Sequence, residues 1–141
     1  MSIFYHIVLR IGFPWGYEVR YIKYVPIRKT KKYEVLITNT TSCTLPVFLL
    51  DSKDKSNIVY WENVDRNWVL QYTYFDHQKE SIIQRKEIGN TVTLKAQNVV
   101  SMALDSLENL HVVWTRQIEG QRVKSSSILY TILDERRNQI I

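Results

Sequence analysis

The sequence is poor in cysteine, histidine and glycine. Its single cysteine, Cys43, excludes a disulfide within the chain and a cysteine-rich metal site. We expect the three histidines to be structural or exposed, so that the chain holds no metal ion, and we expect no cofactor. Four glycines and the lack of a low-complexity segment argue against a flexible linker. The 141 residues therefore predict one folded domain.

The sequence also lacks a long apolar run. No uninterrupted stretch approaches the roughly 18 apolar residues that a membrane-spanning helix needs. The segment MSIFYHIVLRIGF lacks the basic region and the small-residue cleavage site of a secretory signal, and its alternation is typical of a strand. We therefore expect a cytoplasmic protein that does not enter the membrane.

Positive charge is in moderate excess. Nineteen Lys and Arg against fourteen Asp and Glu give a net charge of +5. Such a surplus attracts anions in general and does not by itself indicate nucleic acid as a partner. We interpret it as a solvated basic surface.

Tyrosine and tryptophan are abundant, with nine and four residues spread along the chain. Apolar residues alternate or form short blocks rich in β-branched and aromatic side chains, with turn residues between them. Signals for helices are nearly absent. In NWVLQYTYF (67–75) both alternating faces are largely apolar. This pattern predicts an all-β fold in which this strand is covered on both sides by other sheets.

A repeat of about 50 residues orders these strands. Placing Trp61 on Trp114 sets NIVYW over LHVVW at a spacing of 53, and Asp51 then matches Asp105 at a spacing of 54. We interpret the two aspartates as turn residues that cap a hairpin through side-chain hydrogen bonds to the backbone. A tyrosine-bearing strand follows each tryptophan, as VLQYTYFD in one copy and SILYTILDE in the other.

The segment HIVL near the start matches HVVW 105 residues later, which is close to two periods. With the four strands of a unit named a to d, the chain reads b-c-d, a-b-c-d, a-b-c-d, which is about eleven strands or 2.75 units. A period of about 40 to 50 residues with four strands per unit is typical of β-propeller blades. The expected units cover residues 1–40, 44–88 and 97–141.

The succession of D…NLHVVW and ILYT…D resembles the blade repeats of sialidase-like (BNR-like) β-propellers. The resemblance covers residues 4 to 141 and implies a stack of four-stranded antiparallel blades. The chain departs from the Asp-box S-x-D-x-G-x-T-W, because no Gly and no Thr-Trp ending follow Asp105 and Asn109 in that spacing. The resemblance therefore implies an architecture and does not identify an activity.

Fewer than three blades are too few to close the ring of a propeller. Propellers close with about four to eight blades, and an open stack leaves two apolar sheet faces in water. Two solutions are open. Either two identical chains form a homodimer that closes a six-bladed ring, or the chain is one part of a larger propeller.

In propellers of the resembled families, ligands usually bind near the axis, on the side of the disc that carries the d–a loops and the loops between strands b and c. In this chain, these loops and the adjoining strand ends carry charged and aromatic side chains that suit an acidic sugar or an anionic peptide. The alternative is that they are ordinary solvated loop residues. The candidate ligand-binding residues are Arg10, Trp15, Glu62, Arg66, Arg116 and Arg122.

The turns expected between strands c and d hold most of the excess positive charge. They would line one rim of the disc as an anion-binding surface, whose affinity falls steeply with salt. The alternative is that these charges protect the outermost strands from edge-to-edge aggregation. The residues of this expected basic rim are Arg28, Lys29, Lys31, Lys32, Arg136 and Arg137.

The sequence favours a non-enzymatic β-propeller-type module that binds a carbohydrate or protein ligand or acts as a scaffold. No motif assigns catalytic residues. The first alternative is a fragment of a sialidase-like glycoside hydrolase, which would need an arginine triad, a Tyr–Glu pair and an acidic Asp. The second alternative is a binder of anionic polymers through the basic rim.

Overall fold

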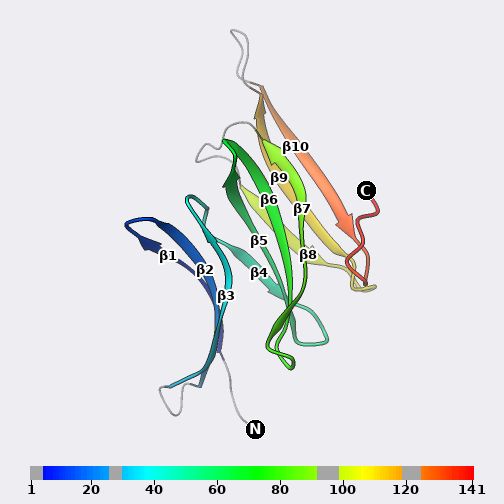
Figure 1. The fold of residues 1–141 in the computed structure, drawn as a ribbon. Helices are drawn as coiled ribbons and strands as arrows, with labels where there is room; N and C mark the ends of the chain where they lie inside the picture. Colours follow the sequence, from blue (N-terminus) through cyan, green and yellow to red (C-terminus); the bar gives the residue numbers. More distant parts are fainter. Residues whose placement is uncertain (1–4, 26–29, 92–98, 119–124) are drawn as a thin grey trace.

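The structure is a computed structural model that describes residues 5–25, 30–91, 99–118 and 125–141. The described backbone forms ten β-strands and no helix, which confirms the predicted all-β class (Figure 1). The strands are β1 (Tyr5–Phe13), β2 (Gly16–Val25), β3 (Thr30–Thr40), β4 (Val47–Leu50), β5 (Lys55–Val64), β6 (Asn67–Asp76), β7 (Ser81–Thr91), β8 (Val100–Leu104), β9 (Leu110–Ile118) and β10 (Ser125–Leu133).

Three antiparallel sheets follow one another along the chain. Strands β1–β3 form the first sheet, β4–β7 the middle sheet and β8–β10 the third sheet, each with its strands in sequence order. Figure 1 shows the sheets side by side, with the middle sheet between the other two. Because antiparallel neighbours can be joined by short turns, each sheet is a simple meander. Within the described residues the sheets do not close into a ring or barrel.

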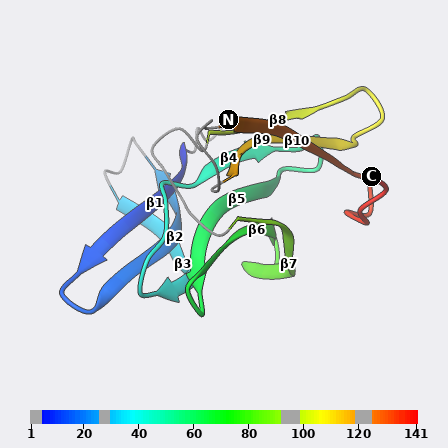
Figure 2. The same cartoon turned by 90° about the horizontal axis from the view of Figure 1, so that it is seen from above.

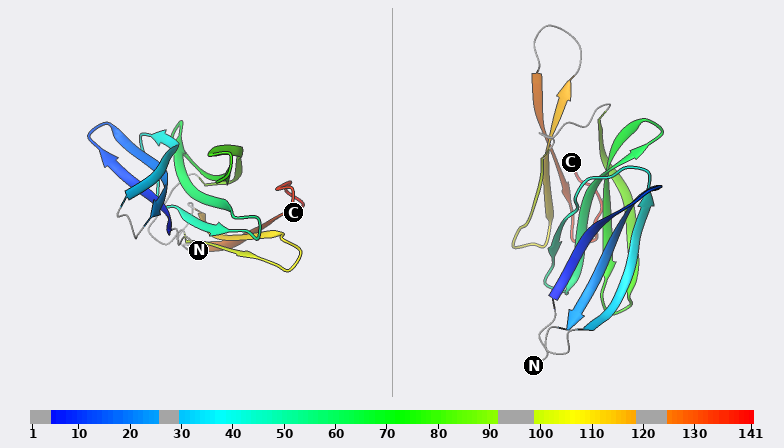
Figure 3. Two further views of the ribbon diagram at one scale, coloured as in Figure 1. Left: turned by 90° about the horizontal axis from the view of Figure 1, so that it is seen from below. Right: turned by 90° about the vertical axis from the view of Figure 1, so that its left-hand side faces the viewer.

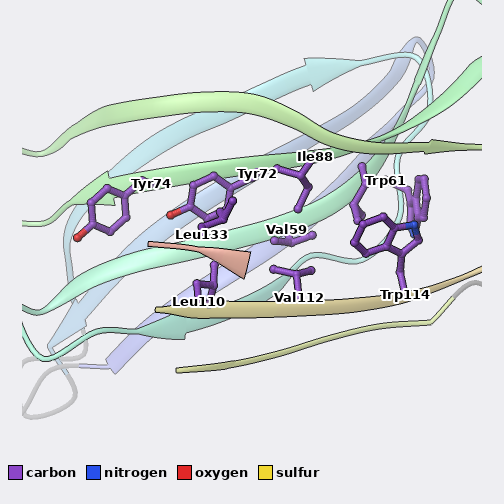
Figure 4. Close-up of a cluster of buried hydrophobic side chains, with 10 residues drawn as sticks. Val59, Trp61, Tyr72, Tyr74, Ile88, Leu110, Val112, Trp114 and Leu133 are labelled. Carbon is purple, nitrogen blue, oxygen red and sulfur yellow. The ribbon is translucent and has the colours of Figure 1, made fainter. Parts of the chain in front are cut away.

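Both faces of the middle sheet are buried, as the pattern of NWVLQYTYF predicts. In β6, Leu70 and Tyr72 pack against the third sheet, while Phe75 packs against the first sheet. This alternation follows from the two-residue period of a strand. The cluster against the third sheet, drawn in Figure 4, also contains Trp61 and Trp114. The core therefore consists of two sheet interfaces, which Figure 2 shows from above.

One expected strand does not form in the described part of the chain. The pattern predicts an eleventh strand at QII, but this segment makes an isolated bridge between Gln139 and Leu133. The amide of Ile140 also donates to the carbonyl of Ile132 at 2.9 Å. The tight turn at 134–138 places these last residues beside β10 without a full ladder. The described residues therefore form ten strands and not the expected eleven.

The same five-residue turn occurs three times at one end of the stack. In each copy an aspartate Oδ1 accepts two backbone N–H groups of the turn. The carboxylate therefore satisfies amides that the tight turn leaves without backbone partners. This confirms the predicted role of Asp51 and Asp105 and adds a third copy at Asp134. The fourth residue of each turn has a positive φ: Asp54 (57°), Glu108 (63°) and Arg137 (67°).

A buried ion pair joins these turns across the second interface, between the middle and third sheets. Arg137 Nη2 lies 3.1 Å from Asp51 Oδ2, and both side chains are 1% exposed. Arg137 also donates to the carbonyl of Glu108 at 2.7 Å, and Tyr74 donates its hydroxyl to Asp51 at 2.5 Å. Burial opposes ionisation of Asp51, but the Tyr74 hydrogen bond, turn amides and Arg137 together lower its pKa. The ion pair therefore attaches the third sheet to the middle sheet.

Loss of this ion pair should be costly. Arg137→Ala leaves the Asp51 carboxylate buried without its charged partner, and we expect the free energy of unfolding to fall by about 3–5 kcal/mol. Arg136→Ala is the matched control, because the Arg136 side chain is 82% exposed. Its loss should change stability by less than about 0.5 kcal/mol. Urea unfolding at pH 7 measures both variants, and equal losses would contradict the structural role of Arg137.

Gly89 in β7 lies where the second interface leaves no room for a side chain. A Cβ built on it would come within 2.7 Å of Cζ2 of Trp114, whose ring is buried in the core. We therefore expect Gly89→Ala to lower the free energy of unfolding by about 1–3 kcal/mol through overpacking. Gly12→Ala is the control, because its Cβ would meet Tyr17 at an ordinary 3.4 Å. That variant should change stability by less than about 1 kcal/mol. Urea unfolding compares the two, and a Gly89→Ala chain as stable as Gly12→Ala would show a looser interface.

Candidate functional site

A hydrogen bond between side chains of neighbouring strands occurs in all three sheets. In each case a tyrosine hydroxyl contacts a His or Asn side chain of the preceding strand. On its own strand, the tyrosine lies two residues before the residue that pairs directly with the His or Asn. This offset is the same in all three sheets, so the three pairs are equivalent in register. The three sheets are therefore built on one plan. The pairs are His6–Tyr21 at 2.5 Å, Asn57–Tyr72 at 2.7 Å and His111–Tyr130 at 2.5 Å.

The next sheet covers two of these pairs and leaves the third open. Tyr21 packs against the middle sheet and Tyr72 against the third sheet, and both are fully buried. Tyr130 is 43% exposed, and the side chain of His111 is 30% exposed. The open pair lies on the face of the third sheet that points away from the core. This outer face of the third sheet is the candidate functional site, and its described residues include Ser101, Ala103, His111, Val113, Thr115, Ile128, Tyr130 and Ile132.

Asp105 orients the open pair. Its Oδ2 lies 3.1 Å from His111 Nε2, while its Oδ1 accepts backbone amides of the turn. Hydrogen bonds from Asn109 and His111 hold the pKa of Asp105 below its usual value, so it is a carboxylate at neutral pH. A carboxylate only accepts, so Nε2 of a neutral His111 carries the proton and Nδ1 accepts from Tyr130. The tyrosine oxygen then keeps a free lone pair for a donor on a partner.

Apolar side chains surround the open pair. Ile128 is 77% exposed and Val113 is 37% exposed. Their equivalents in the middle sheet, Leu70 and Val59, are fully buried under the third sheet. Apolar surface of this kind supplies affinity, and a fixed polar group within it supplies orientation. The geometry therefore suits a partner that has an apolar surface and a hydrogen-bond donor.

Two of the predicted ligand-binding residues lie together at the first interface, between the first and middle sheets. Arg10 donates to the carbonyl of Cys43 at 2.8 Å, and Cys43 forms a β-bridge with Glu62. Glu62 is buried, and its carboxylate accepts from Arg85 at 2.8 Å and from Thr38 at 3.1 Å. This corrects the prediction for Glu62. Strand β5 continues past this residue and directs its side chain toward the first sheet.

The other predicted ligand-binding residues lie in separate places. Trp15 is 67% exposed and stacks on Phe13 with ring centroids 5.0 Å apart. Arg66 lies in the turn between β5 and β6 with a φ of 69°, and Arg116 is half-buried in β9. Arg122 lies outside the described residues. A ligand site shared by these side chains stays a prediction.

The structure contradicts one member of the expected basic rim, Arg137. Arg137 is buried, because its guanidinium pairs with Asp51 of the middle sheet and donates to the carbonyl of Glu108. Lys31 and Lys32 belong to strand β3 and not to a turn. Arg136 remains exposed in the turn after β10. Outside the described residues lie Arg28 and Lys29.

The first interface also contains a histidine pair that has no signal in the sequence. His6 and His77 come from different sheets, and their ring centroids are 4.7 Å apart. Nε2 of His77 lies 2.9 Å from Ser56 Oγ, and the side chain is 4% exposed. Burial and the nearby His6 and Lys23 lower the pKa of His77 to about 4, against the weaker opposing effects of Asp54 and Asp76. No sequence motif connects these two histidines, so the contact depends on how the sheets pack.

Comparison of the chain with protein-family models, with curated proteins and with solved structures finds no match. Among the described residues, no group of three or more His, Cys, Asp or Glu side chains is placed to hold a metal ion. The same part of the chain has no helix with the length and apolar character needed to cross a membrane. The function must therefore be argued from the geometry of the sheets.

His77 should make stability depend on pH. Its pKa is about 4 in the folded chain against 6.5 for a free histidine, so acidification protonates the unfolded chain first. This contribution to stability is full above pH 6.5 and is lost as the pH falls toward 4. We expect the loss to be about 2 kcal/mol between pH 7 and pH 5. His77→Gln can still bond to Ser56 but does not titrate, so its profile should be flatter. Urea unfolding at each pH measures this, and parallel profiles would contradict the assignment.

Proposed function

We propose that the chain is a non-enzymatic β-propeller-type module that acts as a binding or scaffold protein. The open His111–Tyr130 pair is the observation that carries this proposal, because the next sheet covers both of its equivalents. In this proposal the three sheets are successive blades. The outer face of the third sheet is then a blade face that needs a neighbour.

The alternatives have weaker support. A sialidase-like glycosidase needs acidic and basic groups that are free to meet a sugar. Here Glu62 is bound by Arg85 inside the first interface, and Arg137 is bound to Asp51 inside the second. A basic rim for anionic polymers loses Arg137 for the same reason.

A protein partner suits this face better than a sugar does. The exposed side chains of Ile128 and Val113 offer apolar contact beside the hydrogen-bonded Tyr130, and a protein surface can match such a mixture. The partner is either a second chain, which gives a six-bladed ring, or the remaining blades of a larger propeller. Both partners would cover the open pair in the way that its equivalents are covered.

The proposal predicts that the outer face of the third sheet either associates or binds an apolar probe. Light scattering after size-exclusion chromatography reports the mass, and fluorescence of 8-anilinonaphthalene-1-sulfonate reports open apolar surface. Ile128→Asp should reduce whichever signal the unmodified chain gives, because it places a charge at a 77% exposed position of this face. Leu107→Asp is the control, since Leu107 is 73% exposed but lies in a turn.

An unmodified chain that has the 16.8 kDa mass of a monomer and binds no dye would overturn the proposal. Equal effects of Ile128→Asp and Leu107→Asp would overturn it as well. A panel of fluorogenic glycosides that includes a sialoside tests the enzyme alternative. Turnover on that panel would contradict the non-enzymatic assignment.

A further inference from the structure

The equivalent tyrosine pairs allow the faces of the three sheets to be compared residue by residue. In strand β5 of the middle sheet, Ile58 and Tyr60 point to the first sheet. Val59 and Trp61 point to the third sheet. The middle sheet therefore presents one set of side chains to the sheet before it and another set to the sheet after it.

The third sheet follows the same plan on its inner side. Val112 and Trp114 of β9 are the equivalents of Ile58 and Tyr60, and they pack against the middle sheet. The alignment of Trp61 with Trp114 by sequence is therefore wrong by one residue, because the turns before the two strands have the same length. Val113 is the equivalent of Val59 and is 37% exposed on the outer face. The middle sheet packs on the third sheet with the face that carries Val59. The outer face of the third sheet corresponds to that face.

The two faces of the first sheet also correspond to those of the middle sheet. Val8 of β1 is the equivalent of Val59 and packs against the middle sheet. Ile7 and Leu9 alternate with it and are the equivalents of Ile58 and Tyr60, so they point outward. The middle sheet packs on the first sheet with the face that carries Ile58 and Tyr60. The outer face of the first sheet corresponds to that face.

The outer face of the first sheet is also apolar. Tyr5 is 54% exposed and Leu9 is 38% exposed. Arg20 and Glu18 lie on this side and neutralise each other in an ion pair of 2.6 Å. The right-hand view of Figure 3 looks onto this face, which no described segment of the chain covers. Its apolar residues include Tyr5, Ile7, Leu9, Ile22 and Tyr24.

We propose that the outer face of the third sheet packs against the outer face of the first sheet of a second copy of the chain. This inference rests on the proposed function and names its partner. The contact repeats the packing of the first sheet on the middle sheet and of the middle sheet on the third. It covers the His111–Tyr130 pair as its two equivalents are covered. Because two different faces meet, the contact is heterologous, and two copies that make it twice close a ring of six sheets.

Two variants that each block one face test this contact. Leu9→Asp places a charge on the outer face of the first sheet, and Ile128→Asp places one on the outer face of the third sheet. Each variant keeps one intact face that has no complement on its own copies, so each alone should have the 16.8 kDa mass of one chain. In an equimolar mixture the two intact faces are complementary. Light scattering should then report twice the mass of one chain, and Leu107→Asp should assemble like the unmodified chain.

Three results would overturn the inference. A variant that dimerises by itself would show that like faces meet. A mixture that stays at the mass of one chain would show that the two faces do not meet. An unmodified chain that remains a monomer would also show that the two faces do not meet. If that monomer binds the dye, the inference fails but the proposed function does not. Circular dichroism checks that the variants fold. If an Asp variant melts early, Leu9→Thr and Ile128→Thr repeat the test with a residue that suits strands.

Discussion

A sheet that is apolar on both faces cannot be stable in water, and this constraint decides how the whole chain is arranged. The middle sheet buries Val59 and Trp61 on one side and Ile58 and Tyr60 on the other. The first and third sheets cover its two faces, and their inner faces carry the apolar residues that pack against it. Because the covering sheets are built on the same plan, their outer faces are apolar too. Apolar surface therefore remains exposed to water at the two ends of the stack.

Apolar contact alone does not fix how one sheet lies on another, because it has no direction. Buried polar groups supply that direction at both interfaces. At the second interface, the ion pair of Asp51 and Arg137 joins two sheets, while at the first interface Thr38 of β3 hydrogen-bonds to Glu62 and Arg85 of the middle sheet. Such pairs contribute little net stability but penalise an arrangement that leaves one partner unpaired. The two interfaces therefore carry different polar contacts.

The sequence predicts the parts of this structure that depend on local rules. The two-residue alternation predicts the strands and the double burial of β6, and the spacing of Asp51 and Asp105 predicts their turns. The burial of Arg137 could not be predicted in this way. A repeat of the Asp-x-x-x-Asn spacing at 134–138 marks the turn, but the direction of its fourth side chain depends on a neighbouring sheet. The same holds for Glu62, which needs the end of β5 and the position of Arg85 to be known.

The difference between the covered and open pairs supports the proposal that a partner packs at the ends of the stack. A stack of similar units needs polar terminal faces if it is to remain alone in water. The outer faces here carry Ile128 and Leu9 at positions that face water, and the third sheet adds a hydrogen-bonded Tyr130. The equivalent of Tyr130 in the middle sheet is fully buried without loss of its hydrogen bond. The third sheet can therefore accept a neighbour with no change in its own side-chain pairing, which is the property that a preformed docking face requires.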